Sequence, residues 1–439
     1  MDQDRLLAKF SRARPLRYEP LNLGRWLVWS GFALALLLAP RIFSSGASLS
    51  MMSLMGTVMI YALSYNVLLG QTGMLSFGHA VFSGLGAFIA IHAMNLAGQG
   101  ALPVPLVLIP LVGGIAGFAF GALFGYVTTK RSGTTFAMIS LGIGELVFAC
   151  SLMFPGFFGG EAGISGNRVY GNPVAGISFG PQIQVYYLIA GWLFISAAAM
   201  FALTQTPLGR LANAVRDNPE RAEFIGYDTQ RVRYLMMMLA GFFAGVGGGL
   251  SAINFEIVTA ENVSTARSGA VLLFTFIGGT GVFFGPMLGA IVGIFFTVML
   301  SEFTKAWQLY LGLFFILLVM YAPGGIASLL MANLRIVMHG KFRRVLPSGL
   351  AMAASALLAT AGAIILIEMG YHWSLELANG SQMTLMGIAI DTVRPAGWLV
   401  GLALLAAGAL TFLFTRKPFA AAWNEVNGEI EQLAARTHS

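Results

Sequence analysis

The first side chain in this sequence that could do chemistry is a carboxyl group inside an apolar run. Glu145 lies within TTFAMISLGIGELVFACSLMF, where an ionisable group is costly unless it faces a polar cavity or a partner. This position predicts a residue in the wall of a transport pathway. The alternative is a carboxyl group near a helix bend that bonds to the backbone or to a neighbouring helix.

His79 could likewise lie in the pathway or only pack. A single membrane histidine more often makes a packing hydrogen bond than relays protons.

Small and polar residues interrupt the apolar pattern in two places, QTGMLSFGHA at residues 71–80 and GGTGVFFGP at residues 278–286. Both carry a Thr-Gly pair followed by a Phe-Gly pair, which indicates an internal repeat, with chance in a glycine-rich sequence as the competing explanation. Broken helices in corresponding positions point to a transport pathway, because backbone groups freed near the midplane must line a cavity. The residues predicted to line such a pathway are Gln71, Thr72, Ser76, His79, Glu145 and Thr280.

The longest charged segment, residues 205–234, carries charges of both signs and cannot lie in lipid. The apolar spacing over residues 208–216 predicts one short helix. Asn218 can cap a second helix with Pro219 at its first position, and Gly226 is placed to end it. Two short helices between membrane spans form a rigid projection that a soluble partner can push. We call this projection, residues 208–226, the knob. The alternative is an ordinary loop whose arginines only fix the topology.

No energy source is visible in the chain itself. A phosphate-binding loop needs a lysine followed by Ser or Thr, and none of the five lysines has such a neighbour. The sequence also shows no paired carboxylates, nucleophile motif or metal-ligand cluster, and Cys150 is its single cysteine. We therefore predict a chain that is not an enzyme, with no catalytic residue, no metal site and no cofactor of its own.

The composition places the chain among polytopic membrane proteins, with 57% hydrophobic residues, 10% charged residues and a mean hydropathy of +0.78. At about 20 apolar residues per crossing, the apolar runs predict an all-α fold with about twelve crossings, some short or broken. These are residues 26–44, 49–70, 75–97, 104–127, 133–153, 183–204, 235–255, 268–279, 285–301, 306–322, 350–368 and 396–415.

The basic residues test this alternation, because they gather on the cytoplasmic side of membrane proteins. With both termini cytoplasmic, 20 of the 25 basic residues lie on that side. The five on the other side are Arg41, Arg168, Arg267, Lys305 and Arg394. Because the net charge of +7 is scattered over loops rather than gathered in a patch, nucleic acid is not an expected partner. No cleavable signal peptide is visible in the polar and basic first 25 residues.

Five segments together resemble the permease subunits of branched-chain amino acid (LIV-type) ABC importers, in their LivM-like branch. They cover residues 26–330 in the family's order. The segments are GQTGMLSFGHA at residues 70–80, RSG at 131–133 leading to SLGIGE at 140–145, the cytoplasmic stretch from 208 to 226, GGTG at 278–281 followed by Gly285-Pro286, and APGGI at 322–326.

This resemblance implies an importer in the bacterial inner membrane that carries branched-chain or related amino acids. It implies a LivH-like sister permease, two LivG/LivF-like ATPase subunits that bind ATP and Mg²⁺, and a periplasmic substrate-binding protein. It also makes the second short helix the coupling helix that docks on an ATPase. The implied coupling residues are Arg210, Arg216, Asp217, Asn218, Pro219, Glu220, Arg221, Glu223 and Gly226.

Two departures from the family leave alternatives open. The loop at residues 158–166 carries Glu161-Ala162 where small polar residues or Asp are commoner, so urea, amides and aromatic or other carboxylates remain alternative substrates. An ion-coupled secondary transporter is a weaker alternative, because it leaves the charged knob unexplained.

The second departure is an extension, residues 331–439, beyond the permease region 26–330 and the cytoplasmic segment 1–25. It is predicted to hold two further membrane helices, a polar stretch between them and an amphipathic tail. The hairpin either contacts the binding protein or lies peripherally against lipid, and we favour the second. The tail, with Trp423, Val426, Ile430 and Leu433 near helical spacing, is predicted to lie along the membrane or an ATPase.

Overall fold

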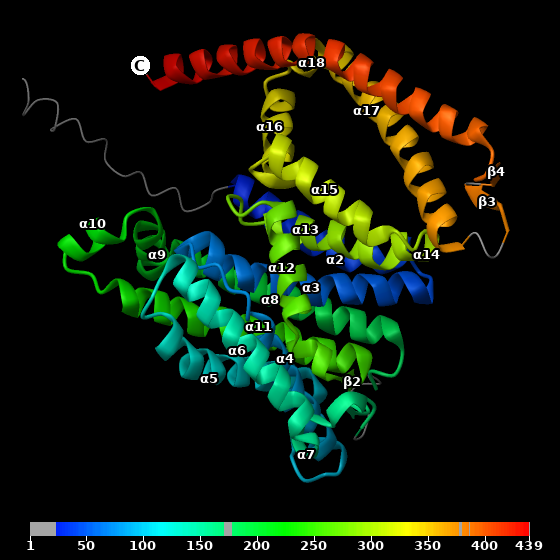
Figure 1. The fold of residues 1–439 in the computed structure, drawn as a ribbon. Coiled ribbons are helices and arrows are strands. Elements are labelled where there is room, and N and C mark those ends of the chain that lie inside the picture. Colours follow the sequence, from blue (N-terminus) through cyan, green and yellow to red (C-terminus); the bar gives the residue numbers. More distant parts are fainter. Residues whose placement is uncertain (1–22, 171–177, 377–379, 386, 439) are drawn as a thin grey trace, which may run out of the picture.

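The computed structural model describes residues 23–170, 178–376, 380–385 and 387–438. Most of the predicted cytoplasmic segment 1–25, and the last residue of the tail, lie outside these residues. Helices dominate the described part of the chain, with two small antiparallel strand pairs that the sequence did not predict (Figure 1). The all-α polytopic fold is confirmed.

The helices and strands follow one another without long loops. In chain order they are α2 (Leu23–Ile42), α3 (Gly46–Thr72), α4 (Ala80–Gly98), η1 (Leu106–Leu108), α5 (Ile109–Thr128), α6 (Gly133–Met153), α7 (Pro155–Phe158), η2 (Gly160–Ala162), β1 (Ile164–Ser165), α8 (Gln182–Gln205), α9 (Pro207–Asp217), α10 (Pro219–Phe224), α11 (Thr229–Phe255), β2 (Ile257–Val258), η3 (Ala260–Val263), α12 (Thr265–Gly278), α13 (Gly285–Ile294), η4 (Phe295–Leu300), α14 (Ser301–Phe303), α15 (Trp307–Tyr321), α16 (Gly325–Met338), α17 (Phe342–Tyr371), η5 (His372–Glu376), β3 (Gln382–Leu385), β4 (Ile388–Asp391) and α18 (Pro395–His438).

Each of the twelve predicted crossings overlaps a helix, but not every helix is long enough to cross alone. Within the described residues, nine helices have the length and hydropathy of a membrane span, and the bent pair α15 and α16 makes a tenth if it counts as one span. The 14-residue α12 is too short to span a bilayer by itself. The predicted number of twelve is therefore not reached by independent spans.

The core forms around α11, which is buried over most of its length and packs against α3, α4 and α5 (Figure 1). Small residues permit the closest contact, between α5 and α11. A Cβ atom on Gly117 would lie 2.1 Å from the Gly241 carbonyl oxygen, and one on Gly245 would lie 2.2 Å from the Gly113 oxygen. Backbones this close maximise van der Waals contact where no hydrophobic effect drives helices together.

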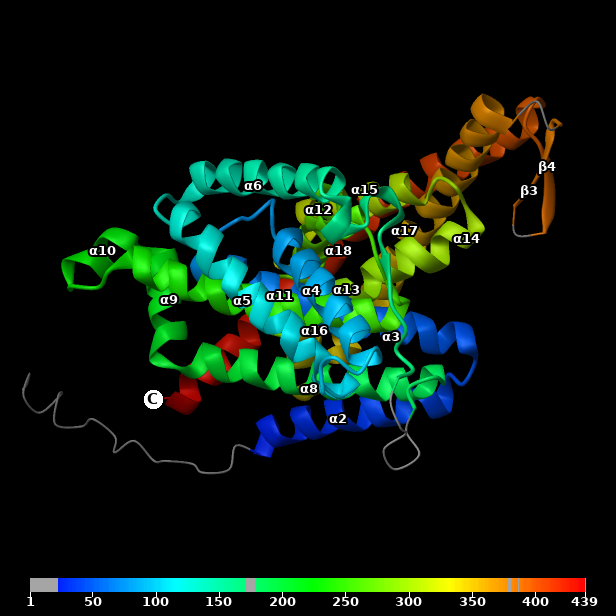
Figure 2. The same ribbon diagram turned by 90° about the horizontal axis from the view of Figure 1, so that it is seen from below.

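The extension is a helical hairpin that leans away from the permease helices (Figures 1 and 2). α16 runs through residue 330, so the predicted domain boundary falls inside a helix. The predicted tail is the continuation of α18, a single helix of 44 residues. Its Val426 and Ile430 are buried against Ile336 and Val345 of the same chain. Two residues of the predicted apolar face thus pack on their own chain. The side chain of Leu433 lies outside the described residues, and contact of the tail with the membrane or an ATPase stays a prediction.

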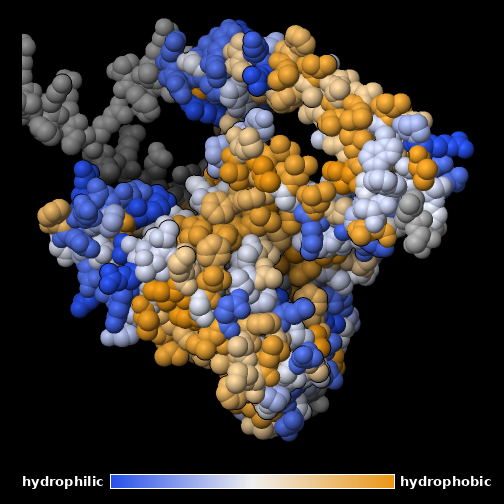
Figure 3. Space-filling view, in the orientation of Figure 1, coloured by the Kyte–Doolittle hydropathy of each residue, from blue (hydrophilic) through white to orange (hydrophobic). Residues whose placement is uncertain are grey.

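The surface agrees with a protein that spans a membrane. Figure 3 shows apolar side chains across the helices, while hydrophilic side chains gather around α9 and α10 and around the far end of α18. The exposed apolar residues include Met138, Leu146 and Leu357, each at least 59% exposed. Such a belt is stable against lipid and costly in water.

Candidate functional site

The first helix break begins where α3 ends at Thr72. Gly73 has a φ of 71° there and donates its N–H to the Leu69 carbonyl, a left-handed position that favours glycine. The chain then turns back along α3. The Tyr65 hydroxyl donates to the Ser76 carbonyl at 3.0 Å, and His79 Nε2 lies 3.0 Å from the Ser64 hydroxyl. Because Ser64 is eight residues before the end of α3, α4 begins roughly 12 Å inside the depth that α3 spans.

His79 makes packing contacts at this level. It is fully buried, its ring stacks on Tyr61 with centroids 5.5 Å apart, and Tyr65 meets its edge at 5.0 Å. The bond from Nε2 to Ser64 fits the packing alternative for this histidine. Its Nδ1 atom, however, is buried with no hydrogen-bond partner among the described residues.

The N-terminal turns of two helices meet at the same point. The Ala80 N–H, the first of α4, donates to the Ser268 hydroxyl of α12 at 2.9 Å. The preceding Phe77 N–H donates to the Ser140 hydroxyl of α6 at 3.0 Å. α12 in turn begins with Ser264 as its N-cap, accepting from the Arg267 N–H at 3.3 Å. The break after α3 is therefore held by hydrogen bonds to three helices, α3, α6 and α12.

Glu145 lies on α6, which runs along the edge of the helix bundle (Figure 2). Its side chain is exposed in this chain and accepts a hydrogen bond from the Thr265 hydroxyl at the start of α12. The carboxylate thus bonds to a neighbouring helix, as in the second of the two alternatives, and its place in a pathway wall stays a prediction. It forms no ion pair with another described residue.

The second break separates α12 from α13. Gly279 ends α12 with a φ of 101°, and α13 begins at Gly285. This break lies against the end of α3, because a Cβ atom on Gly70 would be 3.1 Å from the Thr280 carbonyl oxygen. Gln71 and Thr72 lie at the same end, where the Gln71 Oε1 atom is buried with no partner among the described residues.

The six predicted pathway residues therefore form two groups. Ser76, His79 and Glu145 lie around the N-termini of α4 and α12. Gln71, Thr72 and Thr280 lie where α3 ends. Thr72-Gly73 stands where α3 ends and Thr280-Gly281 stands between α12 and α13. The second of these breaks lies against the last turn of α3 at Gly70.

The charged segment has the predicted local structure. Asn218 caps α10 by accepting from the Arg221 N–H at 2.9 Å, with Pro219 as the first helical residue. Gly226 follows α10 with a φ of 91°. The prediction of two short capped helices is confirmed, because N-cap, first-turn proline and terminal glycine act locally.

Arg216 at the end of α9 reaches the first helix break. Its guanidinium donates to the Gly70 carbonyl, and its Cγ would lie 3.0 Å from a Cβ atom on Gly73. Its Nε also donates to Asp217 at 2.9 Å. Arg210, Glu220 and Arg221 are more peripheral, since all three are exposed. Glu223 accepts from the Thr229 hydroxyl at 2.7 Å.

Sequence reasoning missed two sets of residues here. Phe224 and Ile225, at the tip of the knob, are 91% and 67% exposed among charged neighbours. The sequence signal that could have identified them is an apolar pair inside a charged segment. Arg267, counted above with the external topology signals, lies in the first turn of α12 and is partly buried. The next residue, Ser268, binds the Ala80 N–H at the start of α4.

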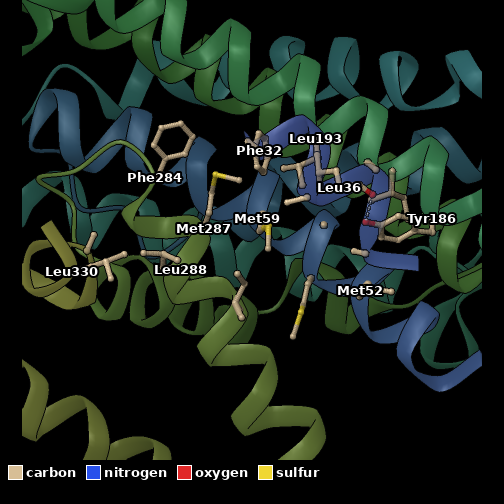
Figure 4. Close-up of a pocket in the computed structure, with 18 of the residues that line it drawn as sticks. Phe32, Leu36, Met52, Met59, Tyr186, Leu193, Phe284, Met287, Leu288 and Leu330 are labelled. Carbon is tan, nitrogen blue, oxygen red and sulfur yellow. Dashed lines mark hydrogen bonds between the residues drawn. The ribbon is translucent and has the colours of Figure 1, made fainter. Parts of the chain in front are cut away.

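A large apolar cavity lies elsewhere, between α2, α3, α8, α13 and α16 (Figure 4). Its volume is about 520 Å³, and Phe32, Met59, Leu193 and Met287 are among its lining residues. The one hydroxyl that it offers, on Tyr186, donates to the Leu36 carbonyl at 2.9 Å. A cavity with this lining fits apolar groups such as hydrocarbon chains. None of the predicted pathway residues lines it.

Comparison with known proteins decides the family. Residues 48–323 match the family described as branched-chain amino acid transport system / permease component, which is more than half of the chain. The chain belongs to this family. It is therefore an ABC-type permease, a transport subunit that crosses the bacterial inner membrane several times, and its family implies ATPase and binding-protein partners.

The relatives of this permease differ in cargo. It is 26% identical over 302 residues to the high-affinity branched-chain amino acid transport system permease protein LivM of Escherichia coli K12 and to that of Salmonella typhimurium, covering 63% of this chain and 69% of each relative. It is 25% identical over 317 residues to the autoinducer 2 import system permease protein LsrC of Shigella flexneri, covering 70% of this chain and 85% of that relative. No solved structure matches it.

Proposed function

We propose that this permease imports branched-chain or related amino acids. On this proposal it pairs with a LivH-like sister permease, receives substrate from a periplasmic binding protein, and is driven by two LivG/LivF-like subunits that bind ATP and Mg²⁺. The LivM relatives support the amino acid cargo. Urea, amides and aromatic or other carboxylates are the alternative cargo for the same architecture, and the LsrC relatives show that the family's cargo varies. Membership in an ABC permease family argues against the ion-coupled alternative.

The observation that carries the proposal is the contact between the knob and the first helix break. The nine coupling residues lie on or beside α9 and α10, and Arg216 joins α9 to the end of α3. The second break touches the same end of α3 at Gly70. A push on α10 would therefore reach the end of α3 through Arg216 and through the buried face of α9, and the second break through the contact of Gly70 with Thr280, as rigid elements transmit motion in rocking transporters.

The tip of the knob supplies the docking surface in this proposal. Phe224 and Ile225 are the most exposed apolar residues of the segment, and two such side chains in a cytoplasmic loop gain free energy only when a partner covers them. The arginines and carboxylates around them form a polar rim. We propose that the ATPase buries this pair, with α9, α10 and both chain termini on the cytoplasmic side.

We propose further that the solute passes along the α6 side of α4 and α12, past Glu145, Ser76 and His79, and leaves near Gln71, Thr72 and Thr280. Glu145 supports this route, since an outward-facing carboxylate on a membrane helix needs a polar passage or a partner subunit to face.

Purification with the products of neighbouring genes tests the proposal. We expect ATPase and sister-permease subunits to co-purify with the chain in mild detergent, and a loaded binding protein to stimulate ATP hydrolysis. A chain that purifies alone and transports with an ion gradient would refute the importer.

A paired variant tests the docking surface within the same preparation. Phe224→Ser with Ile225→Ser should remove the ATPase from the complex and leave the sister permease bound. Met338→Ser is the matched control, because Met338 is 77% exposed at the end of α16, outside the knob. Retention of the ATPase by the double variant would exclude this tip as the docking surface.

A further inference from the structure

The N-terminal turns of α4 and α12 adjoin partway along α3, a helix long enough to span a membrane. Ala80 opens α4 and bonds to Ser268 in the first turns of α12, while Gly84 of α4 packs against the Asn262 carbonyl just before α12. A helix N-terminus carries a partial positive charge. Two of them side by side, on helices interrupted within the membrane, favour a negatively charged group at this point.

Arg267 adds a full positive charge to the same place. It is the third residue of α12 and forms no ion pair with any residue in the described part of the chain. The next residue, Ser268, accepts from the Ala80 N–H, and His79, just before Ala80, stacks on Tyr61 of α3. These contacts place the first turn of α12 beside Tyr61. A guanidinium at membrane depth is costly without a counter-charge. A bound anion next to Arg267 would lower this cost.

Two buried polar atoms beside Arg267 also lack partners. His79 Nδ1 makes no hydrogen bond within the described residues, and the Tyr61 hydroxyl, which has Ser268 as its polar neighbour, makes none of ordinary geometry, although Tyr61 is only 4% exposed and His79 is fully buried. Their rings stack on each other. Buried polar atoms are nearly always paired, so these two mark a place where a polar ligand or ordered water completes the site.

We propose that Arg267, the Tyr61 hydroxyl and the adjoining N-termini of α4 and α12 bind the carboxylate group of the transported solute. This inference rests on the proposed importer function and narrows its cargo. A guanidinium and a hydroxyl both donate hydrogen bonds to a carboxylate oxygen. Urea and uncharged amides lack the charge that this site would stabilise, so amino acids and other carboxylates are its substrate class.

Glu145 fits the amino acid member of that class. It bonds to Thr265, two residues before Arg267 and so on a different side of the same helical turn. The site thus offers a cation on one side of α12 and an anion on the other. A zwitterion moving around this turn meets a group of opposite charge for each of its ends.

The test uses the assembled complex in lipid nanodiscs without its binding protein. The thermal midpoint Tm is measured with L-leucine, L-phenylalanine and benzoate, and with isoamylamine, phenethylamine and benzamide as matched probes that lack the carboxylate. We expect at least one carboxylate to raise Tm while its matched probe does not. Tyr61→Phe and Arg267→Gln should then need about tenfold more ligand or greater for the same shift, as for a lost hydrogen bond to a charged group.

Arg394→Gln is the control, because Arg394 is a remote, 80% exposed arginine paired with Asp391, and it should keep the full shift. Tyr61→Phe keeps the ring that stacks on His79. It therefore tests the carboxylate site even if Arg267→Gln fails to assemble. The inference is overturned if no carboxylate shifts Tm, if matched probes shift it equally, or if Tyr61→Phe retains the wild-type response.

ATP-driven uptake separates this inference from the proposed function. Wild-type complex that imports none of these solutes with its binding protein refutes the amino acid or carboxylate importer. Import by wild type that is undiminished in both variants refutes only the carboxylate site.

Discussion

Arg216 joins the end of α9 to the end of α3 by a hydrogen bond, beside the buried Ala212 and Val215 through which α9 packs on the core. Its guanidinium is shared between Asp217 of the knob and the carbonyl of Gly70. The ion pair with Asp217 is partly exposed, with side chains 39% and 66% accessible, and such pairs add little to stability. We therefore expect the Arg216–Asp217 pair to orient the Arg216 side chain toward Gly70 and to add little to the free energy of unfolding.

The double variant Arg216→Ala with Asp217→Ala should leave the permease pair assembled and weaken coupling. ATP hydrolysis would continue while less solute enters per ATP, because the end of α9 loses its hydrogen bond to the Gly70 carbonyl of α3. The number of solutes imported per ATP in proteoliposomes measures this. Arg343→Ala, an exposed arginine outside the knob, should leave the ratio unchanged. An unaltered ratio in the double variant would count heavily against the knob as transmitter.

Gly78 is placed where no side chain fits. A Cβ atom there would lie 2.2 Å from the Ser140 carbonyl oxygen, so Gly78→Ala must separate the first break from α6. We expect a loss of about 1–3 kcal/mol, as for overpacked cores, seen as a lower Tm in detergent. Gly142→Ala is the control on α6, since nothing lies within 4 Å of its added Cβ. Equal Tm values for the two variants would contradict this packing.

At the scale of elements, the extension is held together by close approach of α17 and α18. A Cβ atom on Gly408 would lie 2.2 Å from the backbone nitrogen of Ala359, and one on Gly362 would lie 2.3 Å from that of Leu405. Near their other ends, Lys341 and Arg344 both bond to Glu429. The hairpin is therefore a packed unit rather than two independent lipid-facing helices.

Gly408→Ala should part the two helices of the hairpin and lower its stability by about 1–3 kcal/mol. Faster cleavage of the β3–β4 connection in limited proteolysis would report the opening. Gly428→Ala lies on the same helix with no atom within 4 Å and should cleave at the wild-type rate. Protection that is the same in both variants would show that this contact does not hold the hairpin.

At the scale of the whole molecule, the extension meets the permease helices mainly through α16 and through Tyr310, whose hydroxyl bonds to Glu368 at 2.8 Å. The core around α11 is complete without it. A chain that ends at residue 340 should therefore assemble and keep binding-protein-stimulated ATPase activity. Loss of stimulation with intact assembly would instead make the hairpin a contact for the binding protein.

The sequence by itself determined the features that depend on neighbours along the chain. Apolar runs located a helix at each predicted crossing, because the cost of exposing polar backbone to lipid acts on each segment separately. Asn218, Pro219 and Gly226 located α10 for the same reason, since caps act within one turn.

Only the tertiary structure decided which of these segments meet. Arg216 lies 146 residues from the Gly70 carbonyl that it binds, and Ala80 lies 188 residues from Ser268. The sequence counted Arg267 as an external charge, whereas the structure places it in the first turn of α12, next to the Ser268 that binds the start of α4. Val426 and Ile430 of the tail pack on Ile336 and Val345 of the same chain. Helix packing sets these contacts through shape and small residues at distant positions, which hydropathy and local spacing do not encode.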